Sequence, residues 1–273
     1  MKIGIIGFGN MGQAIAERLK SKYRVLVFDK DKSKTSFLKE IEVAKDAKEL
    51  VNKADVVILA VKPQDFDSVL KEISDYVKEK LIISIAVGVE TKYIEKTLGY
   101  VRVIRAMPNL GVKIGESVTC ISGGAFITKK DLAFAEELFS YLGKTRKIEE
   151  RNMNAATAIS GSGPGYIFYY METNSIDPVS VTVQIRNDII EHLEKAAQSV
   201  GFSPEEAKFL AVSTTTSSLS LATITKIAPA ELKKQVASKG GTTEAALKVL
   251  TDGGSWPDAA QAALKRAEEL ARR

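Results

Sequence analysis

A glycine-rich segment near the N-terminus carries a clear chemical signal. Gly7-Phe8-Gly9-Asn10-Met11-Gly12 directly follows an apolar run, residues 2–6, and opens an amphipathic stretch, residues 10–20. Gly7 allows a tight turn, Gly9 lets a pyrophosphate approach the backbone, and Gly12 lets a helix pack closely on a strand. The start of that helix offers free amides and a partial positive charge to phosphates. Because a strand precedes the pattern and a helix follows it, we interpret it as a dinucleotide site rather than a plain glycine turn.

The residue that ends the second apolar run bears on the choice between NADH and NADPH. Asp29 stands where an acid binds the ribose 2′-hydroxyl of NAD and repels the phosphate of NADP. Lys30, Lys32 and Lys34 follow and could neutralise that phosphate. The alternative interpretation is a solvated charged turn. We therefore expect NADH or NADPH as the cofactor, with a slight preference for NADH.

Two further strand ends are candidates for the nicotinamide half of the site. They are Ala60-Val61-Lys62-Pro63 and Arg105-Ala106-Met107-Pro108-Asn109. Open α/β sheets bind ligands just beyond the carboxyl ends of their strands, so both turns should line the same crevice. Asn109 offers a donor and an acceptor where the reacting ring should lie, next to Met107 and Pro108. Lys62 is equally interpretable as a surface lysine.

The elements that must position these residues divide the chain into two halves. Up to about residue 150, amphipathic stretches alternate with apolar runs at residues 2–6, 23–28, 55–61, 81–86, 101–106 and 117–122. Residues 56–61 are apolar throughout, as in a strand that is buried on both faces of a parallel sheet. We predict a doubly wound, Rossmann-type α/β domain over residues 1–150. Helical spacing at residues 204–223, 230–237, 243–250 and 256–272 predicts an all-helical domain over residues 151–273.

Composition excludes several classes of function. The 273 residues carry 39 basic and 34 acidic side chains, and the net charge of +5 is scattered, which argues against nucleic-acid binding. No run approaches the roughly 18–20 apolar residues of a membrane span, and the first seven residues do not resemble a signal peptide. We therefore expect a cytoplasmic protein. The single cysteine, Cys120, is interpreted as a core residue, and no metal-binding cluster is expected.

Three stretches taken together resemble pyrroline-5-carboxylate reductases. They are Arg105-Ala106-Met107-Pro108-Asn109, Ala158-Ile159-Ser160-Gly161-Ser162-Gly163-Pro164-Gly165-Tyr166, and Pro229-Ala230-Glu231-Leu232 leading to Ser238-Lys239-Gly240-Gly241-Thr242-Thr243. The resemblance implies reduction of the cyclic imine 1-pyrroline-5-carboxylate to L-proline by NADPH or NADH, the last step of proline biosynthesis. It also implies a homodimer formed through the helical domain, or a larger ring of such dimers. Small residues along 207–223 would permit close helix contact there.

The resemblance assigns roles within the second glycine-rich loop, residues 238–243. It implies that Thr243 contacts the ring nitrogen as the catalytic residue, and that Ser238, Gly240, Gly241, Thr242 and Thr243 bind the substrate. The residues themselves form a loop rich in hydroxyls and glycines, before a helix that starts near Thr243. Such a loop can bind a carboxylate, and the alternative interpretation is a plain helix-capping turn. Residues 160–165 are predicted as a small-residue turn, with Pro164 in the first turn of a helix. Lys239 stands where the family usually has proline.

Residues 173–191 interrupt the family pattern. Joining Glu172 to His192 gives one continuous helix of the usual length, so these residues look like a natural inserted loop, an engineered graft or a sequence error. Asp177-Pro178 breaks helices, and the alternation of Val179, Val181, Val183 and Ile185 with polar residues predicts a strand. Such a strand would pair with its copy in a twofold-related subunit, or the segment would be a solvated loop.

Two other functions are compatible with the first half of the chain. β-Hydroxyacid dehydrogenases share the fingerprint but carry a lysine a few residues after a glycine-rich turn. Here Gly165 is followed by Tyr166-Ile167-Phe168-Tyr169-Tyr170, without a lysine. The only histidine, His192, is interpreted as a surface helix residue, so a histidine acid–base pair is not expected. A non-catalytic NAD(P)-binding module is the remaining alternative, because the insertion could have degraded the site.

Overall fold

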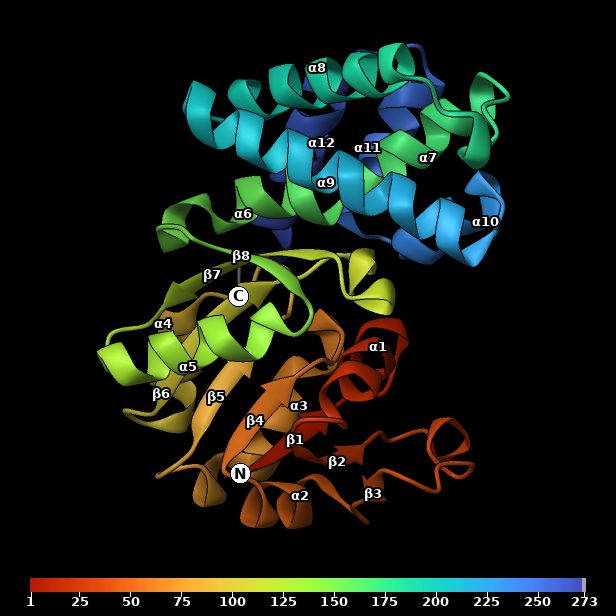
Figure 1. The fold of residues 1–273 in the computed structure, drawn as a ribbon. Helices are drawn as coiled ribbons and strands as arrows, with labels where there is room; N and C mark the ends of the chain where they lie inside the picture. The colour runs from red at the N-terminus through yellow and green to blue at the C-terminus, as the bar shows by residue number, and fades with distance from the viewer. Residues whose placement is uncertain (272–273) are drawn as a thin grey trace. The chain divides into compact units, whose positions relative to one another are not determined.

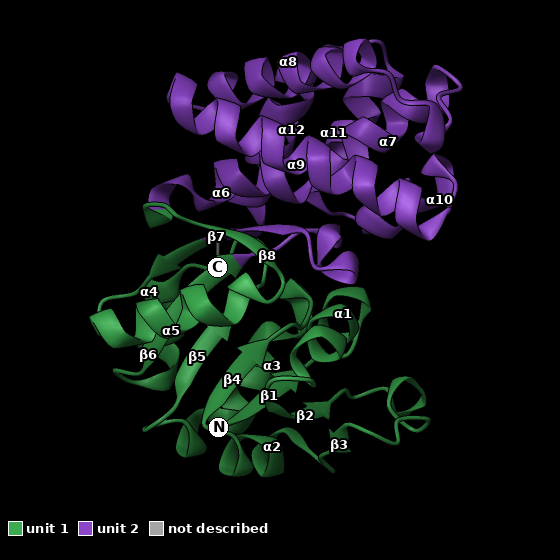
Figure 2. Ribbon diagram, viewed as in Figure 1, with its two compact units in different colours: residues 1–106, 121–150 green, residues 107–120, 151–273 purple. Residues whose placement is uncertain are grey.

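The structure is a computed structural model that describes residues 1–271, and the chain divides into two compact units (Figures 1 and 2). Unit 1 comprises Met1–Ala106 and Ile121–Glu150, and unit 2 comprises Met107–Cys120 and the chain from Arg151 onward. Residues 107–120, which we predicted in the first domain, belong to unit 2. No helix within residues 1–271 is both long enough and apolar enough to cross a membrane.

Within residues 1–271, eight strands form one sheet in the order β3-β2-β1-β4-β5-β6-β7-β8. The pairs β1–β2, β1–β4, β2–β3, β4–β5 and β5–β6 are parallel. The chain runs from β1 outward to β3, and then from β4 outward in the other direction, so the order reverses at β1. The doubly wound Rossmann-type prediction is therefore confirmed, and such a reversal opens a crevice beyond the strand ends. The strands are β1 (Lys2–Ile6), β2 (Arg24–Phe28), β3 (Glu42–Val43), β4 (Val56–Leu59), β5 (Leu81–Ser84), β6 (Arg102–Met107), β7 (Ser117–Gly123) and β8 (Gly143–Lys147).

Strand β4 is buried on both faces, as its unbroken apolar sequence predicts. Val57 and Leu59 pack with Leu50 and Phe66 in one core cluster, while Ile58 between them is buried outside that cluster. Two-sided burial requires helices on both faces of a parallel sheet. The helices of unit 1 are α1 (Asn10–Leu19), α2 (Ala47–Lys53), α3 (Pro63–Ile73), α4 (Thr91–Leu98) and α5 (Lys129–Ser140).

Unit 2 is helical, as predicted, apart from the last residue of β6, the start of β7 and connecting segments. The predicted helix end at Arg272 lies outside the described residues. The helices are α6 (Met153–Ala156), α7 (Gly163–Thr173), α8 (Val183–Ser199), α9 (Pro204–Thr225), α10 (Pro229–Val236), α11 (Thr242–Thr251) and α12 (Trp256–Ala271), with a 3-10 helix at Leu110–Ile114 and a π-helix at Thr157–Gly161.

The small residues of α9 pack inside their own chain. Ser213, Thr214, Thr215, Ser217 and Ser218 are each at most 4% exposed. A Cβ added at Gly111 would lie 2.0 Å from the Ser217 hydroxyl, and one at Gly163 would lie 3.4 Å from the Thr214 methyl. These small residues thus make close contacts between helices of one chain.

The prediction of a turn at residues 160–165 is wrong. The π-helix at Thr157–Gly161 leads through a single residue, Ser162, into α7. The Thr157 and Ser160 hydroxyls donate to the carbonyls of Met153 and Ala156, at 2.8 and 2.9 Å, so these residues bond back into the preceding helical turn. Pro164 lies in the first turn of α7, as predicted. Here the glycines serve close packing between helices rather than a turn.

The prediction of a strand in residues 173–191 is also wrong. Helix α7 ends at Thr173, and Ser175 adopts a left-handed φ of 52°. The Thr182 hydroxyl then accepts the Ile185 amide at 3.2 Å and caps the start of α8. The valine alternation therefore straddles a helix start instead of lying in one element. Ile189, fully buried on α8, shows that packing favours the helix.

Candidate functional site

The glycine loop between β1 and α1 requires glycine at two positions. Gly7 has a φ of +100°, and a Cβ there would lie 2.5 Å from the Ala60 carbonyl oxygen. A Cβ at Gly12 would lie 2.0 Å from the Gly7 carbonyl oxygen. By contrast, a Cβ at Gly9 would meet no atom within 4 Å. Gly7 and Gly12 thus hold the loop tightly against the end of β4, while Gly9 faces open space.

The start of α1 is available to an anion. Gly9 is the N-cap of the helix, and it makes no side-chain capping bond. The first intrahelical bond across this end runs from the Gln13 amide to the Gly9 carbonyl at 2.9 Å. The amides before Gln13 point out of the helix end, and the helix dipole adds about half a positive charge there. This arrangement suits a pyrophosphate.

Asp29 is an internal anchor of the loop. It is 8% exposed, whereas Lys30, Asp31 and Lys32 in the turn that follows are exposed. The carboxylate itself is therefore shielded from solvent, although the charged turn beside it is solvated. One carboxylate oxygen accepts the Phe8 amide at 2.7 Å, the other accepts the Asp31 amide at 2.9 Å, and the Lys34 ammonium lies 3.3 Å from both oxygens. The carboxylate is therefore bound to the glycine loop and balanced by a cation.

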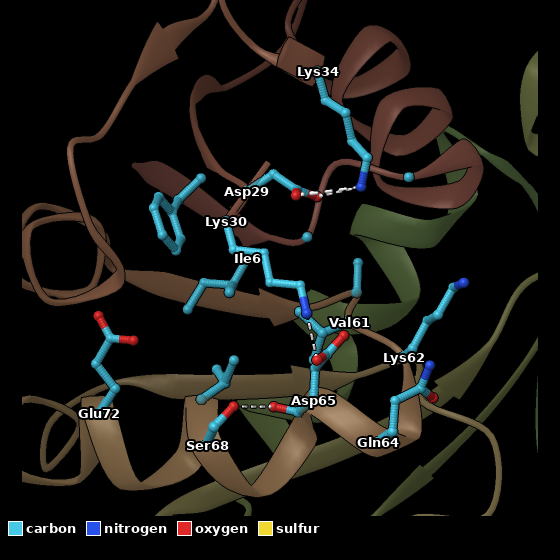
Figure 3. Close-up of a pocket in the computed structure, with 15 residues that line it drawn as sticks. Ile6, Asp29, Lys30, Lys34, Val61, Lys62, Gln64, Asp65, Ser68 and Glu72 are labelled. Carbon is cyan, nitrogen blue, oxygen red and sulfur yellow. Dashed lines mark hydrogen bonds and ion pairs between the residues drawn. The ribbon is translucent and has the colours of Figure 1, made fainter. Parts of the chain in front are cut away.

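A cavity of about 450 Å³ lies beyond the carboxyl ends of β1, β2 and β4 (Figure 3). The Lys30 ammonium pairs with Asp65 at 2.5 Å, in the middle of the view, and Lys34 reaches Asp29 at the upper side. Lys62 is exposed and also lines the cavity, so both interpretations of this lysine apply. Of the residues predicted here, the cavity is lined by Gly7, Gly9, Asp29, Lys30, Ala60, Val61 and Lys62, whereas Phe8, Asn10, Met11, Gly12 and Pro63 do not line it.

Sequence reasoning missed the lining from α3. Gln64, Asp65 and Ser68 line the cavity from the first two turns of this helix. The available signal was Pro63, because proline is favoured at the first position of a helix. Read in that way, Pro63 places the following residues on a helix that begins at the strand end.

The predicted turn at Met107–Asn109 lies in unit 2 and is rigid. The Asn109 side chain is 1% exposed, and its oxygen accepts the amides of Gly111 at 3.1 Å and Val118 at 3.3 Å. Its NH₂ group has no hydrogen-bond partner within residues 1–271. A Cβ at Gly161 would lie 3.7 Å from the Met107 sulfur, so the π-helix abuts this turn. Asn109 therefore has a donor to offer, as predicted, while its acceptor is used locally.

The loop of residues 238–243 ends at α11, which begins at Thr242. The Gly241 amide donates to the Ser238 carbonyl at 2.8 Å, and the Gly240 amide donates to the Glu244 carboxylate at 2.7 Å. Both loop amides are thus used to shape the loop. Gly241 caps the helix without a side-chain bond, so the amides of Thr242 and Thr243 face the helix end. These two amides, rather than those of Gly240 and Gly241, suit a carboxylate.

Three buried hydroxyls meet at this helix start. The Ser162 hydroxyl lies 2.9 Å from that of Thr242, and the Thr243 hydroxyl donates to Ser162 at 3.1 Å. Tyr166, one turn further along α7, donates its hydroxyl to the Ala158 carbonyl at 2.8 Å. Burial raises the pKa of Tyr166, and a hydrogen bond with Ser162 opposes part of that rise, so the phenol stays protonated. The cluster brings together Thr242 and Thr243, which were predicted, and Ser162, which was not.

Arg266 of α12 is a further residue that sequence reasoning missed. Its Nε donates to the Gly240 carbonyl at 2.8 Å, and a terminal nitrogen pairs with Glu269 at 2.8 Å. Gly240 has a left-handed φ of +69°, so the arginine holds a turn of the loop in place. Nothing in the local sequence connects positions 240 and 266.

Comparisons with known proteins extend over the whole chain. Residues 2–88 match the family described as NADP oxidoreductase coenzyme F420-dependent, and residues 187–272 match the family described as pyrroline-5-carboxylate reductase dimerisation. The pyrroline-5-carboxylate reductase of Aquifex aeolicus is 35% identical over 260 residues, covering 93% of this chain and 90% of that protein.

Solved structures give the same picture. A pyrroline-5-carboxylate reductase from Coxiella burnetii is 33% identical with a TM-score of 0.64, covering 99% of this chain and 98% of that one. The pyrroline carboxylate reductase of Plasmodium falciparum, solved with NADP bound, is 25% identical with a TM-score of 0.66, and the coverage is again 99% and 98%.

Proposed function

Because the chain belongs to the pyrroline-5-carboxylate reductase family, we propose that it reduces 1-pyrroline-5-carboxylate to L-proline with NADH or NADPH. The observation that carries this proposal is the loop of residues 238–243, where buried hydroxyls meet an uncapped helix start. That arrangement can hold a carboxylate through amides and contact a ring nitrogen through a hydroxyl. A small cyclic imino acid presents both groups.

The dinucleotide would be held in unit 1 by the glycine loop. Gly9 leaves open space, the amides at the start of α1 face it, and the cavity of about 450 Å³ continues along β1, β2 and β4. These features fit a pyrophosphate and a ribose. When bound, the reduced nicotinamide supplies a hydride. Asn109, whose NH₂ group is buried and unpaired within the described chain, is the proposed contact for its ring.

The substrate residues have less to do than in a ketone reductase. When the ring nitrogen is protonated beforehand, the neighbouring carbon readily accepts a hydride. As the hydride bonds to that carbon, the π electron pair of the C=N bond moves to the nitrogen and the amine forms. The chain must then orient the ring and hold its two polar groups. We assign the carboxylate to Thr242, Thr243 and Ser238, and the ring nitrogen to the Thr243 hydroxyl.

The two alternative functions lack support in the site. A β-hydroxyacid dehydrogenase needs a lysine near the glycine-rich segment, and α7 from Gly163 to Thr173 contains none. His192 is exposed on α8, as predicted, and its Nδ1 lies 2.7 Å from the Asp188 carbonyl. What supports an active site over a degraded module is that the hydroxyls of Ser162, Thr242 and Thr243 are bonded to one another. The insertion begins about 16 Å away, at the far end of the 11-residue α7.

Spectroscopy of the cofactor tests the proposal. Purified protein should oxidise NADH or NADPH, followed in the near ultraviolet, when 1-pyrroline-5-carboxylate is added, and a β-hydroxyacid with oxidised cofactor should give no signal. Turnover of the hydroxyacid alone would favour the dehydrogenase alternative. Cofactor binding without turnover of either substrate would favour the non-catalytic module.

Cofactor preference is expected to respond to Asp29. The Asp29→Ser variant removes a negative charge and leaves Lys34 and Lys30 to attract the 2′-phosphate of NADPH. We expect the ratio of kcat/KM for NADPH to that for NADH to rise about tenfold, which corresponds to about 1.4 kcal/mol. Asp29→Asn removes the same charge but keeps an oxygen that can accept the Phe8 amide, so it should raise the ratio without disturbing the glycine loop. An unchanged ratio in both variants would assign the preference to the lysines.

Assembly is proposed to follow the family, as a homodimer through the helical unit or a ring of such dimers. The support is the match of residues 187–272 to the dimerisation family. The symmetric ribbon predicted for residues 173–191 is discarded, because the segment holds no strand. Ile224, near the end of α9, is 60% exposed and offers an apolar contact for a partner.

Deletion of residues 173–191 is expected to leave a folded protein with one helix from Tyr166 to Val200. Tyr170 and His192 would then be three residues apart on one helix face, and their rings already lie 6.2 Å apart across the insertion. The deletion also removes the buried Ile189, so the melting temperature should fall by several degrees. Circular dichroism measures the helix content and the melting temperature, and size-exclusion chromatography measures the assembly state. An unfolded or unassembled variant would show that the segment is structural.

A further inference from the structure

We propose that Ser162 is a positioning residue that orients the Thr243 hydroxyl, so that its oxygen accepts a hydrogen bond from the protonated ring nitrogen. The inference rests on the proposed reduction of a cyclic imine, and it adds a residue and a bond direction to it. Ser162 is 1% exposed and lies between the π-helix and α7. It is 81 residues away from Thr243 in the sequence.

The bond direction follows from the hydrogens available. In the bond of 3.1 Å between the two hydroxyls, Thr243 is the donor and Ser162 the acceptor. A hydroxyl carries one hydrogen and two lone pairs. Once Thr243 has given its hydrogen to Ser162, only lone pairs remain for a ligand. The complementary ligand group is an N–H donor, which a protonated imine and the amine product both supply.

The methyl group of Thr243 is fixed as well. A Cβ at Gly165 would lie 2.5 Å from the Thr243 Cγ2, so the methyl occupies the space above this glycine. With the hydroxyl on Ser162 and the methyl against Gly165, a single χ1 rotamer of the β-branched side chain is selected. Thr243 itself is 5% exposed. The direction of its oxygen therefore depends on Gly165 of α7 and on Ser162, the N-cap of that helix.

Ser162 can act as a support because its backbone is held on both sides. Its amide donates to the Thr157 carbonyl at 2.8 Å, and its carbonyl accepts the Gly165 amide at 2.8 Å. The bond of Tyr166 to the Ala158 carbonyl closes the same turn. A side chain on such a frame places its partner more accurately than one on a free loop.

Removal of the support should slow the reaction without affecting the cofactor. In Ser162→Ala the Thr243 hydroxyl can rotate and present its hydrogen to the ring nitrogen. We expect kcat to fall roughly 10- to 100-fold, as for a misplaced contact at the reacting group, with the KM for the cofactor unchanged. Ser160→Ala is the matched control, since it removes a buried hydroxyl that bonds only the Ala156 carbonyl within the described chain. Its kcat should stay within a factor of about two.

A double-mutant cycle separates positioning from a structural role. Thr243→Val keeps the methyl that faces Gly165 and removes the hydroxyl. If Ser162 acts through that hydroxyl, adding Ser162→Ala to Thr243→Val should cause no further loss in kcat. Equal losses from Ser162→Ala in the wild-type and Thr243→Val backgrounds would overturn the proposal.

The cycle also works without turnover, so it can fail separately from the proposed function. An unmodified protein that does not reduce 1-pyrroline-5-carboxylate would sink the proposed function itself. In that case L-proline binding to the protein with oxidised cofactor, measured by calorimetry, replaces kcat. Ser162→Ala should weaken proline binding in the wild-type background and leave it unchanged with Thr243→Val. The same weakening in both backgrounds would again contradict the positioning role.

Discussion

Replacement of Thr243 by alanine is expected to lower kcat about 100-fold while leaving the KM for the cofactor nearly unchanged. A loss of that size is typical when one preorganised hydrogen bond to the reacting group is removed from the transition state. The hydroxyl is buried and bonds Ser162, within a cluster formed by the starts of α7 and α11. Its effect should therefore be confined to the substrate. Steady-state kinetics with varied cofactor and varied imine measure the two effects separately.

Two further substitutions at this position define the cause. Thr243→Ser keeps the hydroxyl and loses the methyl that packs over Gly165, so it should retain more activity than Thr243→Ala. Thr243→Val keeps the shape of the side chain and loses the hydroxyl, so its kcat should be as low as that of Thr243→Ala. Wild-type kinetics in the alanine variant would remove Thr243 from the mechanism.

Gly12→Ala is expected to weaken cofactor binding severely, with a rise of more than about 100-fold in the dissociation constant of the cofactor. The new methyl would lie 2.0 Å from the Gly7 carbonyl oxygen, which is backbone and cannot turn away. Helix α1 and the loop must then separate, so the amides at the helix start lose their position. Overpacking of this kind costs about 1–3 kcal/mol of stability as well. Fluorescence titration with NADPH and a thermal melt measure the two losses.

Gly9→Ala is the matched control for that result. A Cβ at Gly9 meets no atom within 4 Å, and the backbone φ of −80° suits alanine. The protein should keep its melting temperature, yet the methyl would occupy the space through which a pyrophosphate approaches. We expect cofactor affinity to fall at least about tenfold. Unchanged affinity in Gly9→Ala would show that the pyrophosphate binds elsewhere.

The α/β half could be predicted from sequence because each strand carries its own signal. The run at residues 56–61 is apolar throughout, and the glycine pattern marks the junction of β1 and α1, so periodicity and turn chemistry agree. The prediction of a strand in residues 173–191 failed because local pattern and packing disagree there. Val179, Val181, Val183 and Ile185 show a strand period, but the Thr182 cap and the burial of Ile189 decide for a helix start. A short alternation cannot reveal where a helix will find its packing partner.

Site residues could be predicted from the sequence where they belong to a recognisable motif. Residues that only the fold brings to the site could not be predicted. Thr242 and Thr243 lie in a recognisable loop, whereas Ser162 and Arg266 reach that loop from distant helices. Asp29 is an intermediate case. Its position at the end of β2 was evident, but its bond to the Phe8 amide depends on the backbone course of the glycine loop. A bond between a side chain and a backbone amide of this kind can be identified only from the three-dimensional course of the loop.

The central claim, hydride transfer to the imine carbon of 1-pyrroline-5-carboxylate, is tested most directly by isotope tracing. The protein is incubated with the imine and with NADPH or NADH that carries deuterium at the transferable position, and the product is analysed by mass spectrometry and NMR. The predicted result is L-proline with one deuterium at Cδ, the ring carbon that bonds to nitrogen and does not carry the carboxylate. One molecule of labelled proline should form for each molecule of cofactor oxidised. Cofactor oxidation without deuterated proline, or no reaction with either cofactor, would contradict the claim.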